Sequence, residues 1–188
     1  LETQPVSFDQ KEFNLETLNA PLGVQTGFTD LDNVIGALHN GSLNIVASRP
    51  GLGKSYLVTT ITMVATMRYG KRVDLLSLQM SNEHLKNRII ASEARIEYQR
   101  LIRRDFYDYE RTIYLEAVGR LSESSLRIVD DAFLTPTAIR DSCHKIYKNR
   151  GLDLIIVDGI ELIQTQSLYP TIHEERNEIA RYLKNLAR

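Results

Sequence analysis

The sequence has a single cysteine, Cys143, and no tryptophan among its 188 residues. One cysteine excludes a disulfide within the chain and is typical of a protein kept in a reducing cytoplasm. No apolar run reaches the ~20 residues that a membrane-spanning helix needs. Charge of neither sign dominates, because 23 Lys and Arg residues stand against 24 Asp and Glu residues. The sequence therefore predicts no membrane segment and no global basic field, although local basic residues remain compatible with DNA binding.

Apolar residues are plentiful, at 43% of the chain, which suits one compact domain better than two. Residues 1–20 are polar with scattered apolar side chains, so we predict a linker or arm there and one domain over residues 21–188. A short helix is expected next. Thr29 and Asp32 form a capping-box pattern at its start, and Gly36 is expected to end it.

Strand-like and helix-like patterns alternate from residue 43 onward. Four apolar runs have the composition of buried parallel strands, at residues 43–48, 73–78, 126–130 and 152–158. The segments between them carry apolar residues at helical spacing. In the best-marked segment Thr135 caps a helix, Cys143 lies on its buried stripe and Gly151 ends it. The alternation predicts an α/β fold with a mainly parallel sheet and helices on both faces.

A phosphate-binding loop is predicted where the first of these strands meets a helix, in the segment SRPGLGKS. Its glycines let backbone N–H groups point at phosphate oxygens, and the helix N-terminus adds partial positive charge. Lys54 is expected to reach the β- and γ-phosphates of ATP, and the Ser55 hydroxyl to bind Mg²⁺. The alternative is an ordinary turn at a helix start, which the strand–loop–helix context disfavours. The predicted nucleotide-binding residues are Ser48, Arg49, Pro50, Gly51, Leu52, Gly53, Lys54, Ser55 and Tyr56.

An acidic residue ends the last predicted strand. Asp158 follows four apolar residues and is expected at the carboxyl edge of the sheet, where α/β proteins bind their ligands. An Asp at this place can also be a simple turn former. Combined with the phosphate-binding loop, it predicts that Asp158 and Ser55 hold Mg²⁺ together.

Several stretches, in order, resemble the C-terminal motor domain of the DnaB family of hexameric replicative helicases. They are TGFTDLD at 26–32, ASRPGLGKS at 47–55, SLQMS at 77–81, ASEAR at 91–95, LIIVDGIEL at 154–162, and the helix-like residues 178–187. The family loop also lacks the first glycine of the general motif, which accounts for Ser48. The resemblance extends from about Gly23 to Arg188.

The resemblance implies a RecA-like P-loop NTPase core that hydrolyses ATP with Mg²⁺ and couples hydrolysis to DNA unwinding. It implies a homo-hexamer around single-stranded DNA, with primase and a helicase loader as further partners. The setting would be the cytoplasm, in a bacterial, phage or plasmid replicon. The resemblance also implies a continuation past Arg188, with a further strand, DNA-binding loops and an arginine finger. We therefore expect the domain to be incomplete relative to the family, with most DNA contacts in those parts.

Two departures concern catalysis. Gln79 stands where the family has the glutamate that activates the attacking water, and Glu161 stands where it usually has glutamine. The predicted catalytic residues are therefore Lys54, Gln79 and Glu161. Two interpretations stay open. Either Glu161 takes over the carboxylate role, or Gln79 marks a weakly hydrolysing assembly or regulatory relative of the helicase. A small P-loop kinase is a third possibility, but no Arg-rich lid is evident in the sequence.

Overall fold

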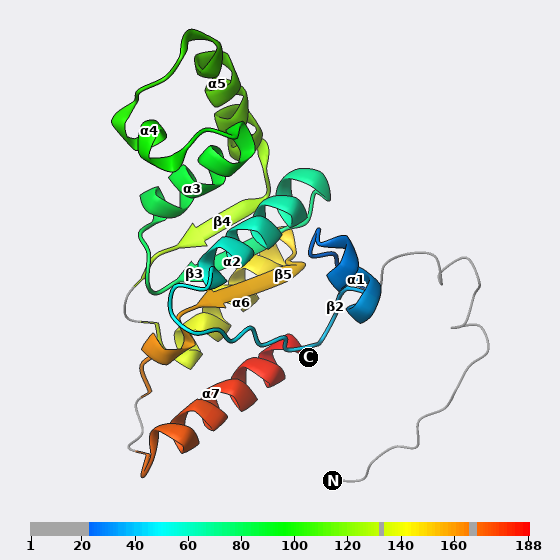
Figure 1. Ribbon diagram of the computed structural model, residues 1–188. Helices are drawn as coiled ribbons and strands as arrows, with labels where there is room; N and C mark the ends of the chain where they lie inside the picture. Colours follow the sequence, from blue (N-terminus) through cyan, green and yellow to red (C-terminus); the bar gives the residue numbers. More distant parts are fainter. Residues whose placement is uncertain (1–22, 132–133, 166–168) are drawn as a thin grey trace, which may run out of the picture.

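The computed structural model describes residues 23–131, 134–165 and 169–188, so the predicted arm at residues 1–20 lies outside the described part. The first elements form a small unit beside the sheet (Figure 1). Strand β1 (Gly23–Val24) pairs antiparallel with β2 (Leu38–His39), and helix α1 (Thr29–Ile35) lies between them in the chain. None of the described helices combines the length and apolarity that crossing a lipid bilayer requires.

The central sheet has three parallel strands (Figure 1). Strand β3 (Val73–Ser77) lies between β4 (Leu126–Val129) and β5 (Leu154–Asp158), and Val73 stands opposite the first residue of each neighbour. The carboxyl ends of all three strands therefore meet at one edge, where Ser77 is opposite Asp158. Three of the four predicted strands and their parallel arrangement are confirmed.

The fourth predicted strand, at residues 43–48, is wrong. Its sequence is apolar, but a strand also needs a neighbour for its backbone N–H and C=O groups. No backbone hydrogen bond joins these residues to β5 or to any other described segment. Leu43 packs against the core, whereas Ile45 and Val46 are 68% and 47% exposed. The phosphate-binding loop is therefore preceded by an irregular segment.

Helices cover both faces of the sheet, as predicted (Figure 1). Helix α2 (Lys54–Met63) continues as the π-helical turn η3 (Val64–Arg68) on one face, where Ala65 packs against Val73. Helices α6 (Pro136–Arg150) and α7 (Ile172–Ala187) lie on the other face, where they pack against Leu76. The alternating side chains of β3 thus enter two separate apolar layers.

A helical lobe extends from the sheet beyond β3 (Figure 1). It contains α3 (Asn82–Ala94), α4 (Tyr98–Arg103) and α5 (Asp108–Glu123), packed around the fully buried Ala117. Arg100 donates two hydrogen bonds to Glu110, at 2.8 and 2.7 Å, and these bonds hold the pKa of Glu110 below its usual range. The bidentate pair fixes α4 against the start of α5.

Three of the four helix-end signals predicted above are confirmed. Thr135 caps α6 by accepting a hydrogen bond from the backbone N–H of Ala138, and Gly151 and Gly36 end α6 and α1. The capping box predicted for Thr29 is wrong. The Asp32 carboxylate instead accepts from the backbone N–H groups of Thr26 and Gly27, at 2.9 and 3.0 Å. Asp32 therefore fixes the turn before α1.

Candidate nucleotide-binding site

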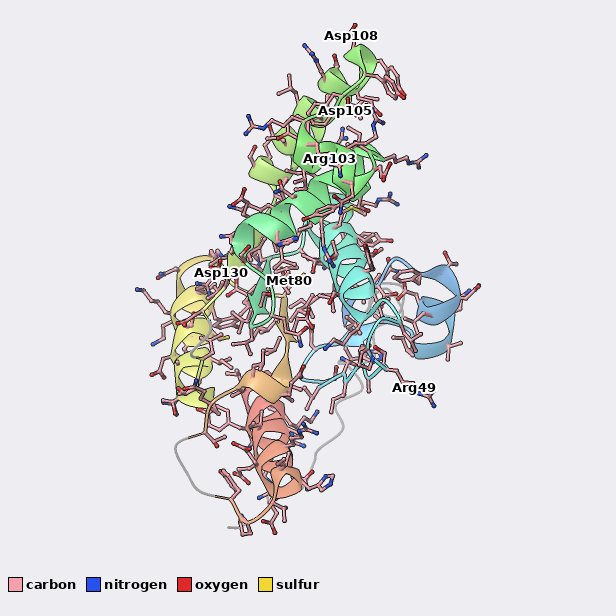
Figure 2. The ribbon with its side chains drawn as sticks, turned by 60° about the vertical axis from the view of Figure 1, so that its left-hand side comes forward. Arg49, Met80, Arg103, Asp105, Asp108 and Asp130 are labelled. Atoms are coloured by element: carbon pink, nitrogen blue, oxygen red, sulfur yellow. The ribbon has the colours of Figure 1, made fainter. Side chains whose placement is uncertain are left out.

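The loop before α2 has the backbone that a phosphate-binding loop needs. Gly51 and Gly53 have φ angles of 80° and 91°, in the left-handed region that other residues rarely adopt. Gly53 is the N-cap of α2, so Lys54 is the first residue of the helix. The loop is open to solvent, with Leu52 71% exposed, and Figure 2 shows Arg49 at the edge of the molecule with its side chain pointing outward.

Lys54 and Ser55 lie against Asp158 across a long stretch of sequence. The ammonium of Lys54 is 3.3 Å from Asp158 Oδ1, and the Ser55 hydroxyl donates to Oδ2 at 3.4 Å. Asp158 ends β5 and its side chain is only 3% exposed. The parallel sheet and the start of α2 thus bring together the three residues that the sequence predicts for phosphate and metal binding.

The chemistry of these side chains fits a magnesium nucleotide. Mg²⁺ prefers oxygen ligands and takes one or two from protein, with water and phosphate oxygens completing its shell. The Ser55 hydroxyl and the Asp158 carboxylate are such ligands, and they already lie within hydrogen-bonding distance of each other. Lys54 adds a positive charge beside them, where phosphate oxygens would lie.

Gln79 and Glu161 meet at the same edge of the sheet. The amide Nε2 of Gln79 donates a hydrogen bond to Glu161 Oε1 at 2.6 Å. Gln79 follows the end of β3, and Glu161 lies in the short 3₁₀ helix η4 (Ile160–Leu162) after β5. The two positions at which the sequence departs from the family pattern are therefore in direct contact.

Sequence reasoning missed two residues that shape this edge. The Ser77 hydroxyl donates to the carbonyl of Met80 at 2.8 Å and accepts from its N–H at 3.1 Å, which sets the turn after β3. Asp130 accepts a hydrogen bond from the backbone N–H of Asn82 at the start of α3. Met80 and Asp130 lie close together near the ends of β3 and β4 (Figure 2). The one sequence signal for this contact is that Asp130 ends a predicted strand, as Asp158 does.

A third missed contact lies beside the loop. The guanidinium of Arg88, in α3, stacks over the ring of Tyr56 at 4.9 Å from the ring centre. Tyr56 is in the first turn of α2 and is 64% exposed. The stacking ties the lobe to the helix that carries the candidate site. No sequence pattern connects residues in these two helices.

Comparison with known proteins identifies the family. Residues 23–188 match the family described as the DnaB-like helicase C-terminal domain. The chain belongs to this family. It is 35% identical over 182 residues to the replicative DNA helicase DnaB of Buchnera aphidicola subsp. Baizongia pistaciae, covering 93% of this chain and 39% of that protein. It is 34% identical over 177 residues to DnaB of Haemophilus influenzae, covering 93% and 38%.

Solved structures of similar proteins have the same fold. A DnaB-like replicative helicase, determined with its interactions with primase, superposes with a TM-score of 0.83 at 26% identity, covering 92% of this chain and 44% of that one. A further solved ATPase domain superposes with a TM-score of 0.84 at 25% identity, covering 95% and 64%. The fold is therefore RecA-like, as the resemblance implied. The chain spans about two fifths of the length of the curated relatives that it matches.

Proposed function

We propose that this DnaB-family domain is the ATP-binding motor of a replicative DNA helicase, which couples ATP hydrolysis to duplex unwinding. The observation that carries the proposal is the meeting of Lys54, Ser55 and Asp158 beside a glycine loop at the start of α2. A cation, a hydroxyl and a buried carboxylate in this arrangement suit a nucleoside triphosphate bound with Mg²⁺.

Each residue has a distinct part in this proposal. Lys54 and the backbone N–H groups of residues 51–55 bind the β- and γ-phosphates of ATP. Ser55 and Asp158 hold Mg²⁺, which when bound neutralises charge that develops on the phosphates. Asp158 is well placed for this part, because its position at the end of β5 is fixed by the sheet and shielded from water.

The partners follow from the family. We propose a homo-hexamer that acts on single-stranded DNA in the cytoplasm, with primase and a helicase loader as further partners. The curated relatives are named replicative DNA helicases, and one similar structure was determined with its interactions with primase. DNA contacts are proposed for other parts of the assembly, because the chain has no excess of basic residues.

Gln79 favours a second candidate function. An amide cannot take a proton from water at neutral pH, so a site that relied on Gln79 alone would bind ATP and hydrolyse it very slowly. Such a protein would use ATP to hold its protomers together or to regulate a partner helicase. ATP-dependent oligomers without turnover would support this candidate, and DNA-stimulated release of phosphate would support the motor.

Unwinding of a forked DNA duplex by the full protein tests the proposed function. We expect strand separation that needs ATP and Mg²⁺ and that is lost in Lys54→Ala, because removing the ammonium removes the charge facing the phosphates. Lys148→Ala is the matched control, since Lys148 is an exposed lysine in the last turn of α6. ATP binding without unwinding by the wild type would favour the assembly candidate. Equal unwinding by Lys54→Ala and the wild type would contradict the proposed site.

A further inference from the structure

Glu161 offers an available carboxylate at the carboxyl edge of the sheet. Its neighbour Asp158 is buried and contacts both Lys54 and Ser55. Glu161 is exposed, and one of its oxygens accepts the hydrogen bond from Gln79. Within the described part of the chain its second oxygen accepts none. Glu161 can therefore bind a water molecule while its position is held by Gln79.

The backbone brings the two side chains together. Ser77 and Asp158 are paired in the parallel register, so Gln79 and Glu161 both lie just past the ends of adjacent strands. Between Asp158 and Glu161 the chain turns at Gly159, which has a φ of 103°. A Cβ at Gly159 would stand 3.1 Å from Cγ of Gln79, so glycine leaves room for this close approach.

The two side chains of the pair differ in what they can do chemically. A carboxylate can accept a proton from water, whereas an amide can donate and accept hydrogen bonds but stays neutral. We propose that Glu161 is the general base of ATP hydrolysis and that Gln79 is the positioning residue that holds it. This inference rests on the proposed function and assigns a residue that the phosphate-binding loop does not supply.

As reactants, the proposed hydrolysis step needs only ATP, one water molecule and Glu161. The second oxygen of Glu161 takes one proton from a water molecule, and the water oxygen forms a bond to the γ-phosphorus of ATP. The bond between the γ-phosphorus and the β–γ bridging oxygen breaks, and its electron pair stays with ADP. Inorganic phosphate leaves, and Glu161 returns its proton to solvent.

ATP turnover and ATP affinity of the full protein with Mg²⁺ test the pair. We expect Glu161→Gln to lower kcat by about 100-fold or more, as for loss of a general base, with nucleotide affinity within about threefold of wild type. The double variant Gln79→Glu with Glu161→Gln keeps one carboxylate and one amide in contact, so we expect it to regain at least about tenfold over Glu161→Gln alone. Glu123→Gln is the matched control, because Glu123 is exposed and precedes β4 at the opposite edge of the sheet.

The pH profile separates a base from a structural residue. Protonation of a general base lowers kcat at acid pH, and this acid limb is expected in the wild type and absent from the residual activity of Glu161→Gln. If the wild type turns over and Glu161→Gln is equally fast, the inference is wrong and the proposed function stands. A double variant no faster than Glu161→Gln would contradict the pairing. If the wild type binds ATP without hydrolysing it, Glu161 is not a base. If it does not bind magnesium ATP, the proposed function itself fails.

Discussion

At the scale of the residue, the backbone conformation of Gly53 affects both the stability of the fold and the proposed binding of ATP. It has a φ of 91°, and a Cβ placed on it would have no neighbour within 4 Å. Gly53→Ala is therefore expected to lower the free energy of unfolding by about 1 kcal/mol through backbone strain alone. It should also weaken ATP binding by about tenfold, because the loop must shift to relieve that strain.

A second glycine separates these two effects. Gly70 has a φ of 61° and a Cβ placed on it would also meet open space, but it lies in the turn before β3. Gly70→Ala is expected to lose similar stability and to bind ATP as the wild type does. Chemical denaturation and titration with a fluorescent ATP analogue measure both quantities. Equal loss of ATP affinity in the two variants would show that the loop itself is not the binding element.

Asp153 is expected to make the free energy of unfolding depend on pH in the acid range. Hydrogen bonds from the Arg72 guanidinium, at 2.7 and 2.8 Å, lower the pKa of Asp153 from 3.8 to about 2. A lowered pKa means that this carboxylate stabilises the folded state above about pH 4 and that the contribution is lost between about pH 4 and 2. Because the Arg72 side chain is 43% exposed, we expect about 1 kcal/mol after screening by water.

The test is the difference in unfolding free energy between the wild type and Asp153→Asn. We expect this difference to be about 1 kcal/mol at pH 6 and to shrink toward zero at pH 2. Urea denaturation at a series of pH values measures it. A difference that stays constant across the range would mean that the pair does not set the acid response.

The motif residues could be predicted from sequence because their chemistry is tied to local order in the chain. Lys54 and Ser55 open a helix after a glycine loop, and Asp158 ends an apolar run. The contact of Arg88 with Tyr56 could not be predicted, because it depends on how two helices pack. The Gln79–Glu161 contact lies between these cases. Both residues stand out in the sequence as departures from a pattern, but their hydrogen bond depends on the register of β3 and β5.

At the scale of the element, α5 contains a glycine that weakens it. Gly119 lies inside the helix, and a Cβ there would have no neighbour within 4 Å. Gly119→Ala is expected to raise the free energy of unfolding by about 0.5–1 kcal/mol, because alanine loses less backbone entropy in a helix. Gly36→Ala should act in the opposite direction, since Gly36 ends α1 with a φ of 80°. Thermal denaturation of both variants checks the signs, and a destabilised Gly119→Ala would contradict this explanation.

Asp74 joins β3 to two other elements. Its side chain is completely buried and accepts hydrogen bonds from Arg127 in β4, at 2.7 Å, and from Arg150 at the end of α6, at 2.6 Å. Asp74→Asn removes the negative charge that both guanidinium groups face. We expect it to lower the free energy of unfolding by about 2 kcal/mol, less than for fully buried pairs because both arginines are a third exposed.

An exposed carboxylate provides the comparison for Asp74. Asp141 pairs with Arg140 on the surface of α6 and its side chain is 65% exposed. Asp141→Asn is expected to change stability by less than about 0.5 kcal/mol. Urea midpoints of the two variants test the contrast. Equal effects would mean that the buried cluster contributes no more than a surface pair.

The strand predictions are correct where an apolar run also has a neighbouring strand with which to pair. Strands β3, β4 and β5 are apolar runs that also find parallel neighbours. Residues 43–48 have the same composition but find no neighbour in the described part of the chain, so they form no strand. The helix from Pro136 to Arg150 was predictable to its ends, because Thr135 and Gly151 encode its limits locally. Pairing is a property of the whole sheet, and composition alone does not fix it.

At the scale of the whole molecule, the site results from the layered fold. A parallel sheet collects the ends of its strands at one edge, and α2 begins at that same edge (Figure 1). The layers therefore bring a helix start, a buried carboxylate and an exposed glutamate to one place, although they are far apart in sequence. The helical lobe of α3, α4 and α5 extends away from this edge, and Figure 2 shows Arg103, Asp105 and Asp108 on it, far from Arg49.

We propose above all that this domain hydrolyses ATP as a motor acting on DNA. The most direct test is the rate of phosphate release by the full protein, with and without single-stranded DNA, for the wild type and Lys54→Ala. We predict that the wild type turns over, that DNA accelerates it, and that Lys54→Ala abolishes both rates. A wild type that binds ATP but releases no phosphate with DNA present, or turnover unchanged in Lys54→Ala, would contradict the claim.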